Sequence, residues 1–215
     1  MGPFSPPRAE SSLVPHFIRR TRRVWEDLSR PVTLPETTDE WQSLLSGMGP
    51  LPGPFDWSLS LGPMREGKRG RHSRLGSIVN AWQHYGYDEA RQACARLALE
   101  LAKRAQAQLE FDLWAELPHG FESGEPLSFA ALFPEPVCAD LWERAWASSY
   151  DTLPAQADVW DHALRLRVPV AGKRVLLSTP VFDRPELASG CVHLLKAHGA
   201  TWVGLLALAS DTPHE

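Results

Sequence analysis

Hydrophobic and polar positions in residues 172–210 follow the order strand, helix, strand. Residues 175–177 form a short apolar run, residues 187–198 repeat apolar positions at helical spacing before Gly199, and residues 202–208 are almost continuously apolar. The apolar run at residues 202–208 is typical of a parallel strand that is covered on both faces. A right-handed crossover would make the two strands neighbours and parallel.

Residues 64–117 contain no proline, and their pattern predicts two consecutive helices. Ser73 is the expected N-cap of the first helix, and Asp88 the expected N-cap of the second, after the "YGY" break. The apolar faces consist of Leu75, Ile78, Val79 and Trp82 in the first helix and of Ala90, Ala93, Leu97, Leu101 and Ala105 in the second.

Further elements follow toward the carboxyl end. Alternation of Leu109, Phe111 and Leu113 predicts a strand before Pro118, and residues 118–135 are loop-rich with one helical turn. Residues 136–149 have the pattern of a helix, with an apolar stripe. Residues 164–170 alternate as a strand whose outer face carries Arg165 and Arg167. In the expected helix at residues 136–149, the apolar stripe consists of Leu141, Trp142, Ala145 and Trp146.

Prolines recur throughout residues 1–63 and restrict helices to two windows, residues 16–30 and 36–49. In the second window, Thr38 or Asp39 would cap the start and Gly47 the end. We therefore divide the chain into a proline-rich N-terminal extension, residues 1–50, with one or two short helices, and a domain at 51–215. At its start, Phe55, Trp57, Leu59 and Leu61 alternate like an edge strand.

Composition fits one α/β domain with appendages, since the chain has 215 residues and 43% hydrophobic content. Its net charge of -4 means that any nucleic-acid surface must be local. No apolar run is long enough to span a bilayer, and "MGPFSPPRAESS" lacks a secretory signal. We expect a cytoplasmic protein with no membrane partner.

The sequence predicts no metal site and no cofactor. Cys94, Cys138 and Cys191 are far apart and form no CxxC pair, so they are expected in the core. His193 and His198 are five positions apart, a spacing that does not place both on one helix face.

Four collinear segments resemble type I phosphoribosyltransferases, most closely the ComF competence family and the related domain of some RecQ helicases. They are "RLGSIVNAWQHYGYDEARQACARLALELA", "FDLWAELP", "YDTLPAQADVWDHALRLRVPVAGKRVLL" and "LLKAHGATWVGLLALAS". The resemblance covers about residues 70–210. It implies a phosphoribosyltransferase-like α/β fold, a mixed and mainly parallel sheet with helices on both faces.

The departures fall on the family's ligand loop. Where the family has two acids that face the ribose of phosphoribosyl pyrophosphate, this chain has Thr179 and Pro180. Where a Thr-Thr-Gly turn would wrap the 5′-phosphate, it has Asp183, Arg184 and Pro185. Proline donates no N–H, and Asp183 would repel a phosphate. The resemblance therefore implies a degenerate ligand loop formed by Ser178, Thr179, Pro180, Asp183 and Arg184.

Two interpretations of the acids in this loop stay open. Asp183 and Glu186 could hold Mg²⁺ or act as acid and base in a rebuilt site. Alternatively, Asp183 is the N-cap of the following helix, with Pro185 near its first position and Glu186 at its third. The second interpretation needs no ligand, and we prefer it.

A basic segment at residues 65–74, "REGKRGRHSR", is suited to phosphate groups because Arg grips phosphate oxygens bidentately. The alternative is a solvated basic loop. Trp57 or Trp82 could stack bases beside it. The five cations are Arg65, Lys68, Arg69, Arg71 and Arg74.

Three functions follow from these observations. The first is a non-catalytic phosphoribosyltransferase-like module that binds DNA, or a partner protein, in DNA uptake or repair, a setting that only the resemblance implies. The second is an enzyme that acts on a nucleotide or sugar phosphate through a rebuilt site. The third is a protein-interaction subunit, which the prolines and tryptophans suggest.

Overall fold

A computed structural model describes residues 34–66, 70–118, 129–132, 138–144 and 164–211. The chain divides into two compact units, Met1–Val32 and Thr33–Glu215, and the described residues belong to the second. The predicted helix at residues 16–30 lies outside the described residues.

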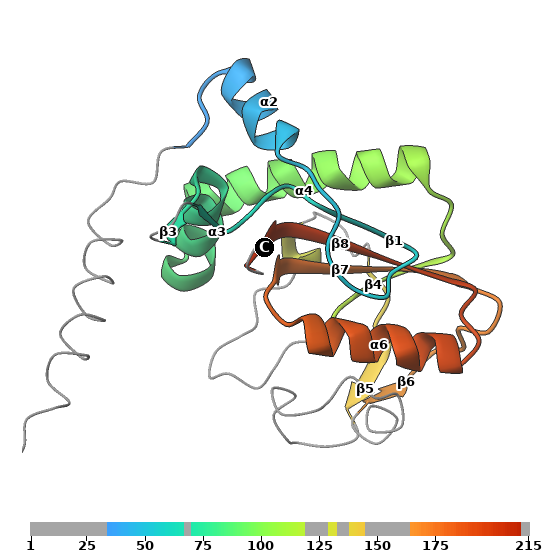
Figure 1. Ribbon diagram of the computed structural model, residues 1–215. Coiled ribbons are helices and arrows are strands. Elements are labelled where there is room, and N and C mark those ends of the chain that lie inside the picture. The colour runs from blue at the N-terminus through green and yellow to red at the C-terminus, as the bar shows by residue number, and fades with distance from the viewer. Residues whose placement is uncertain (1–33, 67–69, 119–128, 133–137, 145–163, 212–215) are drawn as a thin grey trace, which may run out of the picture. The chain divides into compact units, whose positions relative to one another are not determined.

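The second unit is an α/β structure around a four-stranded sheet in which every pairing is parallel (Figure 1). β7 and β8 are neighbours, as the sequence predicts. The prediction of a mixed sheet is wrong, because the antiparallel strand pairs lie in two separate ribbons. The strand order in the sheet is β1 (Trp57–Ser60), β8 (Trp202–Ser210), β7 (Arg174–Phe182) and β4 (Leu113–Glu116). Two antiparallel ribbons are separate from it. In the first, β2 (Arg65–Glu66) pairs with β3 (Arg71–His72), and in the second, β5 (Trp142–Arg144) pairs with β6 (Leu164–Leu166).

Helices cover both faces of this sheet (Figure 1). The chain passes from β1 to β4 through α3 (Arg74–Tyr85) and α4 (Asp88–Gln108), and from β7 back to β8 through α6 (Pro185–Ala197). These two crossovers run in opposite directions along the sheet. Because parallel crossovers are right-handed, α3 and α4 lie on one face and α6 on the other.

Side-chain caps fix two helix starts. Thr37 forms a capping box with Glu40 at the start of α2 (Thr38–Ser46), one residue earlier than the sequence predicts, and Gly47 is the C-cap. Ser73 caps α3, as predicted, through Gly76 N–H. The predicted Asp88 cap is wrong: Tyr87 is the N-cap of α4 without a side-chain bond. Asp88 instead lies in the first turn, where a carboxylate suits the helix dipole.

The predictions of the edge strand at residues 55–61 and of the buried strand at residues 202–208 are confirmed. β1 is the expected edge strand, and β8 is buried almost throughout. Residues 164–170 keep their alternation with Arg165 and Arg167 exposed, although β6 itself is shorter. The helical turn predicted within residues 118–135 is a 3-10 helix, Ala130–Leu132.

Two predictions failed because tertiary partners override local pattern. β4 does not alternate inward and outward: Trp114 and Ala115 are both buried, because the sheet is covered on both faces. Residues 142–144 form β5 rather than a helix, since they pair with β6 and Trp142 Nε1 donates to the carbonyl of Glu116 at 2.6 Å. Ala145 and Trp146 lie outside the described residues.

The core beneath α6 combines distant segments. Leu141 and Leu164 of the β5–β6 region are buried with Leu187 and Cys191 of α6. Cys94 is also buried, as predicted, whereas Cys138 is only partly buried. In the described part of the chain, no helix has both the length and the apolar character needed to cross a bilayer.

Candidate functional site

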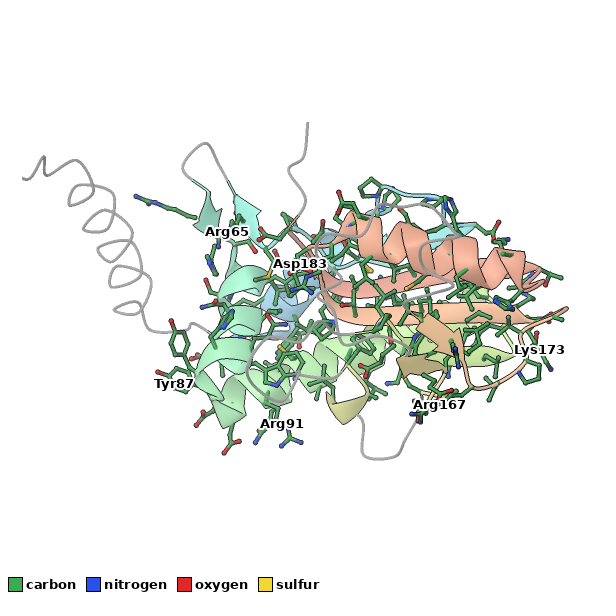
Figure 2. The ribbon with its side chains drawn as sticks, turned by 90° about the horizontal axis from the view of Figure 1, so that it is seen from below. Arg65, Tyr87, Arg91, Arg167, Lys173 and Asp183 are labelled. Atoms are coloured by element: carbon green, nitrogen blue, oxygen red, sulfur yellow. The ribbon has the colours of Figure 1, made fainter. Side chains whose placement is uncertain are left out.

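Open parallel sheets bind ligands at the carboxyl ends of their strands, where neighbouring connections leave to opposite faces. That position lies around the end of β8, because the chain leaves β1 for α3 on one face and leaves β7 for α6 on the other. Figure 2 shows Arg65 and Asp183 at this end of the sheet, and Lys173 at the opposite end. Asp211 follows β8 directly.

The predicted ligand loop is not a loop at its first three positions. Ser178, Thr179 and Pro180 lie inside β7, buried, and Thr179 is 6% exposed. β7 continues because β8 pairs with it as far as Phe182, opposite Ser210. Phe182 anchors the strand in the core and packs edge-on against Phe55, with ring centroids 6.1 Å apart.

Pro180 is tolerated inside this strand because of where β4 ends. β4 pairs with β7 only up to Ser178, whose carbonyl accepts from Leu117 N–H at 2.8 Å. Proline lacks a ladder donor, and it is confined to positions where no partner strand needs one. Beyond Ser178, no described residue continues the ladder on the β4 side of β7.

Ser178 is a core residue rather than a ligand residue. Its hydroxyl is fully buried and accepts a hydrogen bond from Trp114 Nε1 at 3.0 Å. Cys138 Sγ lies 3.9 Å from the same oxygen. Burial and the nearby charge of Glu116 raise the pKa of the Cys138 thiol to about 12, so this cysteine stays protonated at neutral pH and is no nucleophile.

Only Asp183 and Arg184 connect β7 to α6. The predicted Asp183 cap is wrong, since Arg184 is the N-cap, but Pro185 is at the first helical position as expected. Asp183 and Glu186 are both exposed, Glu186 in the first turn of α6. Within the described ranges, no three side chains of His, Cys, Asp or Glu come together in a way that could hold a metal ion.

The basic segment forms an antiparallel hairpin, β2–β3. It lies at the carboxyl edge of the sheet, by which we mean the side where the parallel strands end. Main-chain hydrogen bonds join the chain before it to the end of β8, from Met64 N to Ser210 O at 2.7 Å and from Ser210 N to Gly62 O at 2.9 Å. Ser73, after the hairpin, donates through its hydroxyl to Pro63 O at 2.6 Å. The base of the hairpin is therefore tied to the sheet.

Among the predicted cations that the structure describes, Arg65 and Arg74 have carboxylate partners. Arg65 Nε lies 3.4 Å from Asp211 Oδ1, and Arg74 lies 3.1 Å from Glu40 Oε1. Backbone N–H groups of residues 36 and 37, followed by Arg74, hold the pKa of Glu40 below its usual value, so this partner remains ionised. Arg71 is exposed on β3, whereas Lys68 and Arg69 lie outside the described residues.

Neither tryptophan proposed for base stacking is suited to it. Trp82 is 3% exposed in the core, and Trp57 is a partly buried residue of edge strand β1. The sequence reasoning missed Tyr85 and Tyr87, which are exposed at the corner between α3 and α4 with ring centroids 5.8 Å apart. The "YGY" motif was their only signal, and it indicates a helix break as readily as a surface.

Searches against protein-family models, curated proteins and solved structures found no match to this chain.

Proposed function

We propose that this chain is a non-catalytic, phosphoribosyltransferase-like module that binds nucleic acid through the β2–β3 hairpin. The observation that carries the proposal is the placement of a basic hairpin at the carboxyl edge, held to the end of β8 by main-chain hydrogen bonds. Such a base holds Arg65 and Arg71 on paired strands, which lowers the ordering cost of binding. DNA uptake or repair is the setting that the ComF resemblance suggests.

The connection after β7 supports a lost phosphoribosyl site. A phosphate cradle needs several backbone N–H groups around one anion. Here only Asp183 and Arg184 separate β7 from α6, and the first helical residue, Pro185, has no N–H. Thr179 and Pro180 are buried in the strand and cannot face a ribose.

The decisive experiment compares the wild type with the triple variant Lys68→Ala, Arg69→Ala, Arg71→Ala. We expect DNA binding with weak sequence preference, because phosphate contacts position a protein without specifying bases. The logarithm of affinity should fall with the logarithm of salt by roughly 0.7–0.9 per phosphate engaged. The triple variant should bind more weakly at every sequence and show a smaller salt slope.

Two measurements accompany this comparison. The variant should keep its thermal midpoint, because exposed charges contribute little to stability. Calorimetric titration with phosphoribosyl pyrophosphate and Mg²⁺ should give no binding heat. Heat that disappears in Asp183→Asn would instead establish a rebuilt site. If the wild type binds no DNA even at low salt, the nucleic-acid proposal is wrong and a protein partner takes its place.

A further inference from the structure

Two tyrosines expose their rings at the corner that joins α3 to α4. Tyr85 is 40% exposed and Tyr87 is 52% exposed, and their rings are inclined at 32° to each other. By contrast, Trp82, one turn earlier on α3, is buried. Exposed aromatic rings leave apolar area in water, which is unfavourable unless a partner covers it.

The corner holds both tyrosines in place. Gly86 between them adopts a left-handed conformation, with φ 64°, and its N–H donates to Trp82 O at 3.2 Å. Glycine is the residue that reaches this conformation without steric cost. Tyr87 is already the N-cap of α4, and its carbonyl accepts from Arg91 N at 2.9 Å. The main chain around both rings is therefore fixed by hydrogen bonds.

The segment that ends at this corner is free of carboxylates. Residues 67–87 contain Lys68, Arg69, Arg71 and Arg74 and no Asp or Glu, although the whole chain has a net charge of -4. The acids Glu66 and Asp88 border the segment on either side. Apart from Tyr85, the partly or fully exposed side chains of α3 can all form hydrogen bonds and carry no negative charge, although Glu40 of α2 pairs with Arg74 at one end. These side chains are Arg74, Ser77, Asn80, Gln83 and His84.

α3 connects the hairpin to the tyrosines. Figure 2 shows Arg65 at one end of this helix and Tyr87 at the other. At about 1.5 Å per residue, the 12-residue helix is about 18 Å long, a span that several nucleotides of an extended strand can follow. Positive charge at one end and aromatic rings at the other are the two parts of a single-strand binding surface.

We infer that the ligand is single-stranded nucleic acid, with its phosphates on the β2–β3 hairpin and unpaired bases stacked on Tyr85 and Tyr87. The inference rests on the proposed function and adds the class of nucleic acid to it. Bases of a duplex are stacked on each other and cannot reach the rings, so the tyrosines should favour single strands. The acids Asp88 and Glu89, which follow Tyr87, mark where the strand's phosphates must turn away.

The test titrates the protein against a labelled single strand and against the duplex of the same sequence, with fluorescence anisotropy as the readout. The strand has about 12 nucleotides, a length within the usual site sizes. The variant Tyr85→Ala, Tyr87→Ala should lose about tenfold or more in single-strand affinity, as expected for lost base stacking. Its duplex affinity and salt slope should stay at the wild-type values. Tyr85→Phe, Tyr87→Phe keeps both rings and should bind as the wild type does.

Leu99→Ala is the matched control, because it removes another exposed apolar side chain, on α4. It should change neither affinity, and the thermal midpoints of all variants should agree. This inference would be overturned if the wild type bound single strand and duplex with equal affinity and if Tyr85→Ala, Tyr87→Ala changed neither affinity. The hairpin proposal would then still stand. No binding of either ligand at low salt would overturn both proposals.

Discussion

Arg65 and Asp211 face each other across the carboxyl edge, with Nε 3.4 Å from Oδ1. The carboxylate after β8 therefore occupies one cation of the basic hairpin. Under the proposed function, a phosphate that binds at Arg65 would have to displace Asp211, so this residue would compete with the ligand.

Removing that competitor should tighten binding. We expect Asp211→Asn to raise DNA affinity about two- to fivefold, since a surface ion pair contributes up to about 1 kcal/mol. If Arg65 then engages one more phosphate, the salt slope should increase by about 0.7–0.9. Anisotropy titrations over a salt series measure both quantities.

Glu100→Gln is the matched control for this change. It removes one negative charge on α4, where Glu100 pairs with Lys103 at 2.9 Å. It should leave the salt slope unchanged. Equal effects of Asp211→Asn and Glu100→Gln would mean that only net charge matters and that Asp211 does not compete.

Asp56 stabilises the opposite edge of the sheet. Its Oδ2 accepts from Lys196 Nζ and from Val203 N, both at 2.6 Å, and so ties the chain before β1 to α6 and β8. We expect Asp56→Ala to lower the free energy of unfolding by about 1–2 kcal/mol, mostly through the lost hydrogen bonds, because both side chains are about a third exposed and the charge attraction is screened.

This contribution should depend on pH. Partial burial raises the pKa of Asp56, but hydrogen bonds from Lys196 and Val203 and the charge of Lys196 outweigh it, so the pKa lies below its ordinary value. The stabilisation is therefore complete above the unfolded pKa, near 3.9, and is lost as the pH falls through the folded pKa. Denaturant unfolding at several pH values should show the wild type and Asp56→Ala converging below about pH 4.

Gly76 allows α3 to approach the chain before the hairpin. A Cβ at this position would lie 1.9 Å from the carbonyl oxygen of Met64. Alanine normally stabilises a helix relative to glycine by about 1 kcal/mol, but here we expect Gly76→Ala to destabilise by about 1–3 kcal/mol through the clash. Asn80→Ala, on the same helix, should be neutral or slightly stabilising. Thermal unfolding that shows a gain for Gly76→Ala would mean that Met64 moves freely.

Restoring an acid at position 179 should damage the fold rather than create a ribose site. Thr179 is buried in β7, opposite Ala207, and its hydroxyl donates to Val181 O at 3.0 Å. We expect Thr179→Asp to destabilise by about 3–5 kcal/mol, the cost of an uncompensated buried charge. Thr179→Val, which keeps the volume, should cost much less. A stable Thr179→Asp variant that binds phosphoribosyl pyrophosphate would contradict the placement of this residue inside the strand.

Sequence alone determined the elements whose signals are local. Ser73 caps α3 because the hydroxyl reaches an N–H within the next turn, and β8 is a central strand because both of its faces are apolar. The apolar runs of β7 and β8 with a helix between them require parallel neighbours, since a right-handed crossover is almost invariable. The concentration of cations between Arg65 and Arg74 is likewise visible in the chain itself.

Only the tertiary structure decided where β7 ends and what the cations meet. β7 extends through Pro180 because β8 still pairs with it while β4 has stopped, and residues 142–144 are extended because β6 and the Glu116 carbonyl take up their hydrogen bonds. Glu40 and Asp211, the partners of Arg74 and Arg65, come from opposite ends of the chain. Strand pairing and ion pairing join residues that are distant in sequence, so no local pattern can specify them.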